Sequence, residues 1–208
     1  MGADDRLTLD PAERPWVEVY RRLTEVVLPR PIALVSTVDI EGRPNLAPFS
    51  FFTVVSANPP YLAFSPQLSG RTGQKKDTLR NVEETGEFVV AVVTEALADQ
   101  VNRCSAVLPW GQSEFAASGL TPLPATRVRP HLVAESPVNL ECELVEVRTY
   151  GSEGGAGSLV VGRLLLAHLD PTLCDETGAV VAERLKAVGR MGSDLWVRTW
   201  DTFPMPRP

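Results

Sequence analysis

The chain has 208 residues, of which 44% are hydrophobic and 22% charged, a composition that suits one globular domain with a sizeable core. A formal net charge of −6 argues against a nucleic acid partner, because phosphate recognition needs a basic surface. No apolar run approaches the roughly 20 residues of a membrane span, and residues 1–11 lack the apolar segment of a signal peptide, so we expect a cytoplasmic protein with no membrane partner.

The cysteines give no sign of a metal or redox site. Cys104, Cys142 and Cys174 are an odd number at wide spacing, and none belongs to a C-x-x-C pair. We therefore expect free thiols in a reducing compartment and no metal site.

The first third of the chain predicts a tail, a helix and a strand hairpin. We expect a flexible tail over residues 1–13 and one domain over 14–208. Residues 16–23 suit a short helix that packs Trp16 and Tyr20 onto the body. The β-branched run 32–38 predicts a strand.

A turn at residues 41–44 follows this strand, with Gly42 free to take a positive φ. Residues 45–55 predict the return strand of the hairpin, and residues 61–64 predict the next strand after a proline turn.

Two helices and a buried strand are predicted in the middle of the chain. Residues 76–84 suit a helix that Asp77 or Thr78 caps and that ends at Gly86. Residues 87–94 read as a buried strand, and a second helix over 95–105 follows it.

The remainder is rich in strand patterns. The proline-rich segment 108–130 lacks periodicity and predicts a surface excursion with one helical turn. We expect strands at 138–150 and 158–169 and a short final strand within 190–198. Several antiparallel strands with a few inserted helices predict a mainly β barrel rather than a parallel sheet.

A basic turn precedes the first internal helix. Arg71, Lys75 and Lys76 lie within six positions, and Thr78 adds a hydroxyl donor. Free backbone amides and the helix dipole favour an anion at such a helix start, and a terminal phosphate is the natural ligand. A solvated charge cluster is the alternative.

Small polar residues gather on the predicted hairpin. Ser36, Thr37, Asn45 and Ser50 can be neighbours across the turn, beside flat apolar rings such as Phe49. Such groups can bind the edge of a heterocycle. The alternative is that the rings belong to the core and the hydroxyls decorate a sheet edge.

The ordered set of these motifs resembles the flavin reductase-like family of FMN-binding split barrels, the group that includes flavoredoxin. The resemblance covers most of residues 30–198, and the proline-rich middle matches least. It lies in R-P-I-A-L-V-S-T, G-R-P-N-L-A-P-F-S-F-F, N-P-P-Y-L-A-F-S-P, K-D-T-L-R-N-V-E-E-T-G-E-F-V-V, V-V-G-R-L-L-L-A-H-L-D and R-M-G-S-D-L-W-V-R.

The resemblance implies a Greek-key-like split β-barrel and a homodimer that binds FMN non-covalently near the subunit interface. It implies that the isoalloxazine and ribityl region is lined by Ser36, Thr37, Asn45, Ala47, Pro48, Phe49 and Ser50. It further implies that the phosphate end is surrounded by Ser65, Arg71, Lys76, Asp77 and Thr78.

The resemblance also implies an FMN-dependent oxidoreductase that accepts hydride from NAD(P)H as a transient donor. Electrons would pass to free flavin, a monooxygenase partner or another acceptor. No G-x-G-x-x-G occurs, so the nicotinamide would stack directly on the flavin. No side chain is assigned an acid, base or nucleophile role, because the flavin carries the chemistry.

One departure from the family pattern keeps other readings open. Some members carry a Gly-Asp-His triplet whose histidine helps to hold the nicotinamide, whereas residues 155–158 here read Gly-Ala-Gly-Ser. His168, further along the same strand, is a candidate donor toward the flavin or a structural histidine. The alternatives are a non-catalytic FMN-binding electron carrier and a cofactor-free dimeric scaffold.

Overall fold

The computed structural model describes residues 6–109 and 112–207. Within that part, seven antiparallel strands form one sheet in the order β3-β2-β6-β9-β10-β5-β4. The mainly β, antiparallel fold predicted from the sequence is confirmed. The strands of this sheet are β2 (Ala33–Val38), β3 (Pro44–Phe49), β4 (Phe52–Ala57), β5 (Pro60–Phe64), β6 (Glu87–Val92), β9 (Val138–Tyr150) and β10 (Gly157–Leu169).

The sheet closes on itself, as its connection at Ser50 and Phe51 requires. These two residues alone join β3 to β4, yet the two strands lie at opposite edges of the sheet. Six strand spacings would separate the edges of a flat sheet by about 29 Å, whereas so short a link spans about 10 Å. The sheet therefore curls into a barrel that is split between β3 and β4.

The predicted return strand over residues 45–55 is therefore wrong as a single element. The chain pairs with β2 only as far as Phe49, bends at Ser50 and Phe51, and then pairs with β5 from Phe52 onward. Both halves carry strand-forming residues, and sequence pattern alone does not reveal that they pair at different edges.

An aromatic cluster fills the barrel and confirms its closure. The Phe64 ring lies 5.2 Å from the Phe49 ring of edge strand β3 and 5.3 Å from the Phe88 ring of β6, between ring centroids. A second buried cluster, which includes Leu34, Leu46, Val101 and Phe115, packs helices against the sheet. The predicted polar residues Ser36, Thr37 and Asn45 thus lie on two paired strands, β2 and β3, that have a core on each face.

Among the described residues, the first four helices fall close to their predicted positions, whereas the short last helix was not predicted. The helices are α1 (Trp16–Val26), α2 (Asp77–Thr85), α3 (Ala98–Arg103) after the 3-10 turn η3 (Glu95–Leu97), α4 (Glu114–Ser118) and α5 (Ala182–Leu185). Gly86 ends α2 with a φ of 72°, as predicted. The predicted cap is wrong, because Lys76 is the N-cap of α2 and no side chain bonds there. The Asp77 carboxylate instead pairs with Arg80 at 3.3 Å.

Two small sheets and two 3-10 turns complete the fold. The first sheet joins β1 (Arg30–Pro31), β11 (Val188–Arg190) and β12 (Trp196–Arg198), and the second pairs β7 (Pro122–Leu123) with β8 (Leu132–Val133). The turns are η2 (Pro11–Glu13) and η4 (Pro171–Leu173). Residues 110–111 of the predicted 108–130 excursion lie outside the described part, and its predicted helical turn is α4. The division of the chain at residue 13 stays a prediction.

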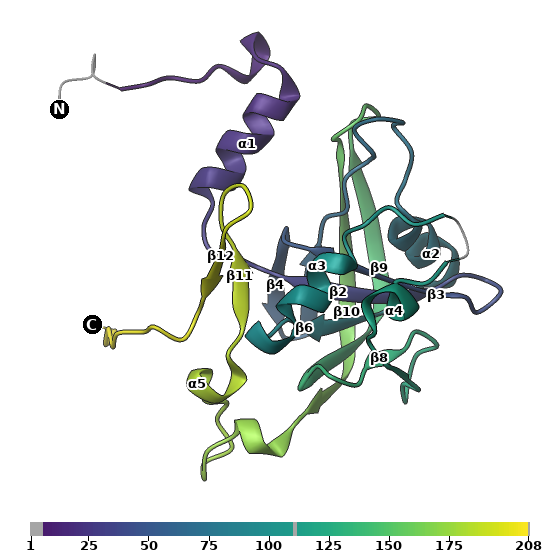
Figure 1. Ribbon diagram of the computed structural model, residues 1–208, viewed down its shortest axis with the longest axis vertical. Coiled ribbons are helices and arrows are strands. Elements are labelled where there is room, and N and C mark those ends of the chain that lie inside the picture. Colours follow the sequence, from purple (N-terminus) through teal and green to yellow (C-terminus); the bar gives the residue numbers. More distant parts are fainter. Residues whose placement is uncertain (1–5, 110–111, 208) are drawn as a thin grey trace.

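Helix α1 stands beside the β11–β12 hairpin, on the side of the molecule where both chain ends lie (Figure 1). The Trp16 ring packs on Gly70 and on Gly155, where an added Cβ would lie 2.7 Å from the ring. Tyr20 lies 6.2 Å from the Phe51 ring. Both predicted contacts of α1 with the body are thus present. None of the described helices has the length and apolar character to cross a membrane.

Candidate functional site

Strand β3 is an edge strand whose outward groups are unusual. The amide of Leu46 points away from β2, because it donates at 2.9 Å to the Glu114 carboxylate of α4. Alternate residues of an antiparallel edge point the same way, so Pro44 and Pro48 also face outward. Proline has no N–H, so both suit an edge and prevent strand addition. The outward edge of β3 therefore offers mainly backbone carbonyl oxygens, which are hydrogen-bond acceptors, to a molecule bound beside it.

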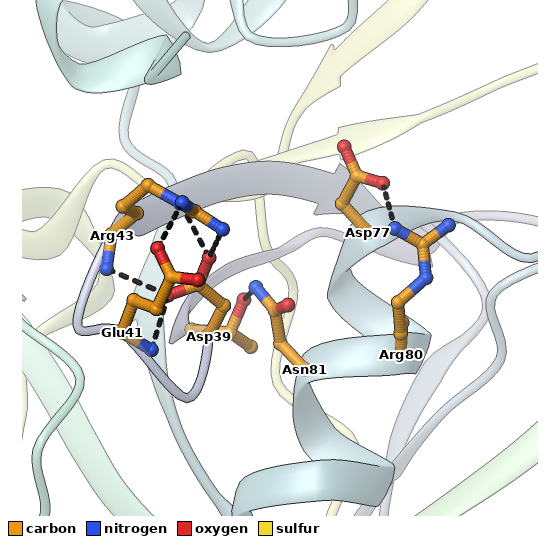
Figure 2. A network of polar contacts seen from close by, with 7 residues as sticks. Asp39, Glu41, Arg43, Asp77, Arg80 and Asn81 are labelled. Atoms are coloured by element: carbon orange, nitrogen blue, oxygen red, sulfur yellow. Dashed lines mark hydrogen bonds and ion pairs between the residues drawn. The ribbon is translucent and has the colours of Figure 1, made fainter. Parts of the chain in front are cut away.

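A buried amide and hydroxyl network joins β3 to α2. Asn45 Nδ2 donates to Thr37 Oγ1 at 3.1 Å and to Thr78 Oγ1 at 2.9 Å. Asn81, which reaches from α2 toward the β2–β3 turn in Figure 2, donates to the same Thr37 hydroxyl at 3.0 Å. The predicted heterocycle cluster and the predicted phosphate cluster therefore meet at Asn45.

The mouth of α2 carries two cations without a carboxylate partner among the described residues. Arg71 and Lys76 are exposed, and neither has an ion pair within 4.0 Å. Lys75, in contrast, pairs with Glu83 at 2.6 Å. The Lys76 ammonium lies 5.9 Å from the centroid of the Phe49 ring, which places it over β3. The two unpaired charges are therefore available to an anion beside this strand.

The turn before β3 has a polar network of its own. The Asp39 carboxylate accepts from the amides of Glu41 and Arg43 at 2.9 Å each and from the Arg43 guanidinium at 2.7 Å (Figure 2). Burial acts to raise the pKa of Asp39, but these hydrogen bonds and the charge of Arg43 outweigh burial and lower the pKa. The network holds the β2–β3 turn and with it the start of the candidate site.

The predicted residues divide between the two faces of β3. Asn45, Ala47 and Phe49 alternate on the face toward α2, where Thr37 and Thr78 lie buried behind Asn45. Pro48 and Ser50 belong to the other face, and Ser36 lies on that side as the register partner of Leu46. The Ser36 hydroxyl is buried and has no hydrogen-bond partner among the described residues.

The remaining phosphate-end candidates lie in the loop before α2 or at its start. Ser65 is half-buried, its amide donates to the Phe51 carbonyl at 2.8 Å, and its hydroxyl faces Gly157 of β10. Asp77 is occupied by Arg80. Arg71 and Lys76 are thus the cations of the predicted set that are open to a ligand.

A cavity of about 350 Å³ opens at the end of β3. Pro48 lines it from β3, Ser50 from the link that follows β3, and Tyr20 from α1. Sequence reasoning missed the other polar and aromatic walls, which include Asn102, Arg190, Asp194 and Trp196. No sequence signal joins them to β3, because the chain reaches Asn102 about 50 residues after β3 and reaches Arg190, Asp194 and Trp196 only after about 140.

His168 lies away from these residues. It belongs to β10, which is four positions from β3 in the strand order. Its Nε2 lies 2.5 Å from the carboxylate of fully buried Glu141, which also accepts the amides of Thr126 and Arg127. In this chain His168 therefore has a structural partner, and it stands outside the cluster around Asn45.

Comparison with known proteins gives a consistent assignment. The sequence profile described as "Flavin reductase like domain" matches residues 25–184. The protein BH2278 of Halalkalibacterium halodurans is 38% identical over 97% of both chains. Nitrilotriacetate monooxygenase component B from Bacillus cereus has a TM-score of 0.90 and 33% identity and covers 96% of this chain and 98% of its own.

The 2-nitrobenzoate 2-nitroreductase NbaA of Pseudomonas fluorescens superposes with a TM-score of 0.84 at 28% identity and covers 97% of this chain and 96% of its own. A split-barrel protein from Shewanella frigidimarina shares the fold, with a TM-score of 0.83 at 21% identity. The profile match spans well over half of the chain and includes β3, α2 and the strands β4 and β5 between them. The chain belongs to the flavin reductase-like family.

Proposed function

We propose that this protein is an FMN-dependent oxidoreductase that accepts hydride from NAD(P)H onto bound flavin and delivers the electrons to a further acceptor. The observation that carries the proposal is the Asn45–Thr78 hydrogen bond, which fixes the acceptor-rich edge of β3 beside the cationic mouth of α2. Family membership adds independent support. Bound FMN would supply the hydride chemistry.

The residues present fit FMN. Arg71 and Lys76 are two exposed cations that pair with no carboxylate in the described part of the chain, which suits a phosphate. The orphaned Ser36 hydroxyl and the outward carbonyls of β3 suit the polar edge of a flavin ring. The residues that would contact the cofactor are Asn45, Ala47, Pro48, Phe49, Ser50 and Ser65. The buried hydroxyls of Thr37 and Thr78 would position Asn45. Asp77 would orient the start of α2 through its ion pair with Arg80.

A homodimer is part of the proposal. Helix α1 exposes Leu23 and Val26 at 52% and 73% of their surfaces, and Val27 follows at 58%; at spacings of three and four residues, these side chains share one face. A contiguous apolar surface of this kind is typical of a protein interface. Because α1 lies at the rim of the 350 Å³ cavity through Tyr20, a second copy on α1 would enclose the site.

The acceptor is proposed as a class. The name of the Bacillus cereus relative suggests a monooxygenase partner as the acceptor, and that of NbaA suggests reduction of a small nitroaromatic acceptor. Free flavin is a third acceptor. The three free cysteines support a reducing, cytoplasmic location.

The test uses purified protein and FMN. We expect a yellow protein, an FMN affinity well above that for riboflavin, and loss of the oxidised flavin absorbance after anaerobic addition of NADH or NADPH. A protein that binds neither flavin would overturn the proposal.

A flavin-binding electron carrier is the second candidate. The tip at residues 155–158 has no histidine to hold a nicotinamide, and the Trp16 ring already packs on Gly155 there. Tight FMN binding without reduction by either nicotinamide, but with reversible reduction by dithionite, would favour the carrier.

A further inference from the structure

Two arginines face each other beside the cavity at the end of β3. Arg30 of β1 and Arg190 of β11 are direct partners in an antiparallel pair, so their side chains leave the sheet on the same face. Like charges in this relation destabilise a sheet. An arrangement that carries such a cost calls for an explanation in terms of function.

Neither guanidinium has a carboxylate partner in the described part of the chain. Arg30 is 6% exposed and donates to the carbonyls of Thr24, Val27 and Met191. Arg190 donates to the Ser193 carbonyl at 2.7 Å and stacks 5.5 Å from the Trp196 ring. Burial lowers the pKa of Arg30, and the nearby charge of Arg190 acts in the same direction against an opposite contribution from Tyr20. The positive charge here is therefore not neutralised by the protein.

The cavity joins this charge to flat apolar walls. Arg190 lines it directly, and Arg30 lies behind Ser50, whose hydroxyl is 3.5 Å from the Arg30 Nε. The rings of Tyr20 and Trp196 and the side chains of Pro48 and Ile32 line the remainder. Asn102 adds an amide, and the carboxylate of Asp194 stands on the rim without an ion pair to Arg190. Aromatic walls with one unpaired guanidinium suit a planar ring that carries one negative charge.

The volume narrows the class of ligand. A cavity of about 350 Å³ lies at the lower end of the range for ligand pockets, roughly 300–1,000 Å³, and is too small for a whole dinucleotide. It accommodates one or two fused rings.

We propose that this cavity is the binding site of a small aromatic carboxylate, with Arg190 holding the carboxylate and Trp196 and Tyr20 enclosing the ring. The role of this ligand as the electron acceptor rests on the proposed flavin oxidoreductase, since Pro48 and Ser50 are shared with the flavin site. Its binding does not rest on that function.

The experiment measures binding of benzoate, which the protein cannot reduce, by titration calorimetry with and without FMN. Benzamide is the uncharged ligand of the same shape. Arg190→Gln should weaken benzoate binding about tenfold or more and leave benzamide unchanged. The matched control is Arg198→Gln on neighbouring β12, whose guanidinium pairs with Glu95 outside the cavity; it should change neither ligand.

A second variant should have the opposite effect on benzoate binding. Asp194→Asn removes a carboxylate that lines the cavity and should tighten benzoate binding about threefold. Equal affinity of the wild-type protein for benzoate and benzamide, or equal effects of Arg190→Gln and Arg198→Gln, would overturn the proposal. Flavin affinity measured on the same samples reports separately on the proposed function.

Discussion

The carboxamide of Asn45 donates a hydrogen bond to the hydroxyl of Thr78 across 2.9 Å, although 33 residues separate the two along the chain. Asn45 is the second residue of the edge strand β3 and Thr78 lies in the first turn of α2, so this bond fixes the distance between a polar strand edge and a cationic helix start. The two clusters predicted from sequence belong to one site because of it.

Lys76→Glu should weaken FMN binding by about 1–3 kcal/mol and riboflavin binding much less, because FMN alone has the phosphate. Fluorescence titration of both flavins measures the difference. Lys75→Glu is the matched control, since it makes the same change of charge one residue away at a lysine that already pairs with Glu83. An equal loss of FMN affinity in Lys76→Glu and Lys75→Glu would mean that net charge, and not a contact at Lys76, determines the affinity for FMN.

Val26→Asp on α1 should dissociate the proposed homodimer, because it places a charge in the exposed apolar surface of that helix. Light scattering after size exclusion gives the mass of each species. Ile40→Asp is the control, since Ile40 is 71% exposed at a turn distant in sequence from α1. A monomeric wild-type protein, or dissociation by Ile40→Asp alone, would contradict the assignment of the interface.

Glu141→Gln should lower stability by about 1–3 kcal/mol at neutral pH, because two backbone amides and His168 lose a buried carboxylate acceptor. Burial acts to raise the pKa of Glu141, but the hydrogen bonds from His168 and from the two amides outweigh it, and the net shift is downward. The unfolded chain thus binds the proton more tightly than the folded one.

The ionised Glu141 side chain therefore contributes its full stabilisation at pH values above the ordinary carboxyl pKa. This stabilisation is lost as the pH falls through the lowered pKa of Glu141 in the folded protein. Urea unfolding at pH 7, 5 and 4 should show a smaller acid loss in Glu141→Gln than in the wild type. Glu146→Gln changes an exposed residue of the same strand, so the unfolding free energy of this variant should depend on pH as it does in the wild type.

Gly162→Ala should destabilise the barrel by about 1–3 kcal/mol, as overpacking does in a close-packed core. An added Cβ would lie 2.2 Å from the Phe88 ring and 3.2 Å from the Glu143 carbonyl. Gly157→Ala on the same strand meets only the Ser65 hydroxyl at 3.1 Å, which can rotate away, so thermal unfolding should show a smaller loss. A larger loss of stability in Gly157→Ala than in Gly162→Ala would contradict this prediction and would mean that the start of β10 is packed more tightly than its middle.

Much of the fold could be predicted because local pattern and tertiary environment agree. Residues 138–150 alternate in part, and they form β9 with the predicted bounds. Gly86 marks the end of α2 because only a residue that tolerates a positive φ suits that position. The error at residues 45–55 arose where a bend of two residues sends the chain to the other edge of the sheet.

The site could be predicted in part for the same reason. Residues of β2, β3 and the start of α2 are close in sequence, and their clustering follows from one hairpin and one helix. Glu114, Arg190 and Trp196 reach the same region from far along the chain, through pairings that sequence periodicity does not encode.

The sequence also predicts that the cysteines are free, and the structure leaves all three unbonded.

The guanidinium of Arg30 has a mechanical consequence for the whole molecule. By donating to carbonyls at the end of α1 and to the Met191 carbonyl, it ties the beginning of the chain to a segment 161 residues later. One buried side chain therefore links the amino-terminal segment to the β11–β12 hairpin, which carries two residues of the cavity wall, Arg190 and Trp196.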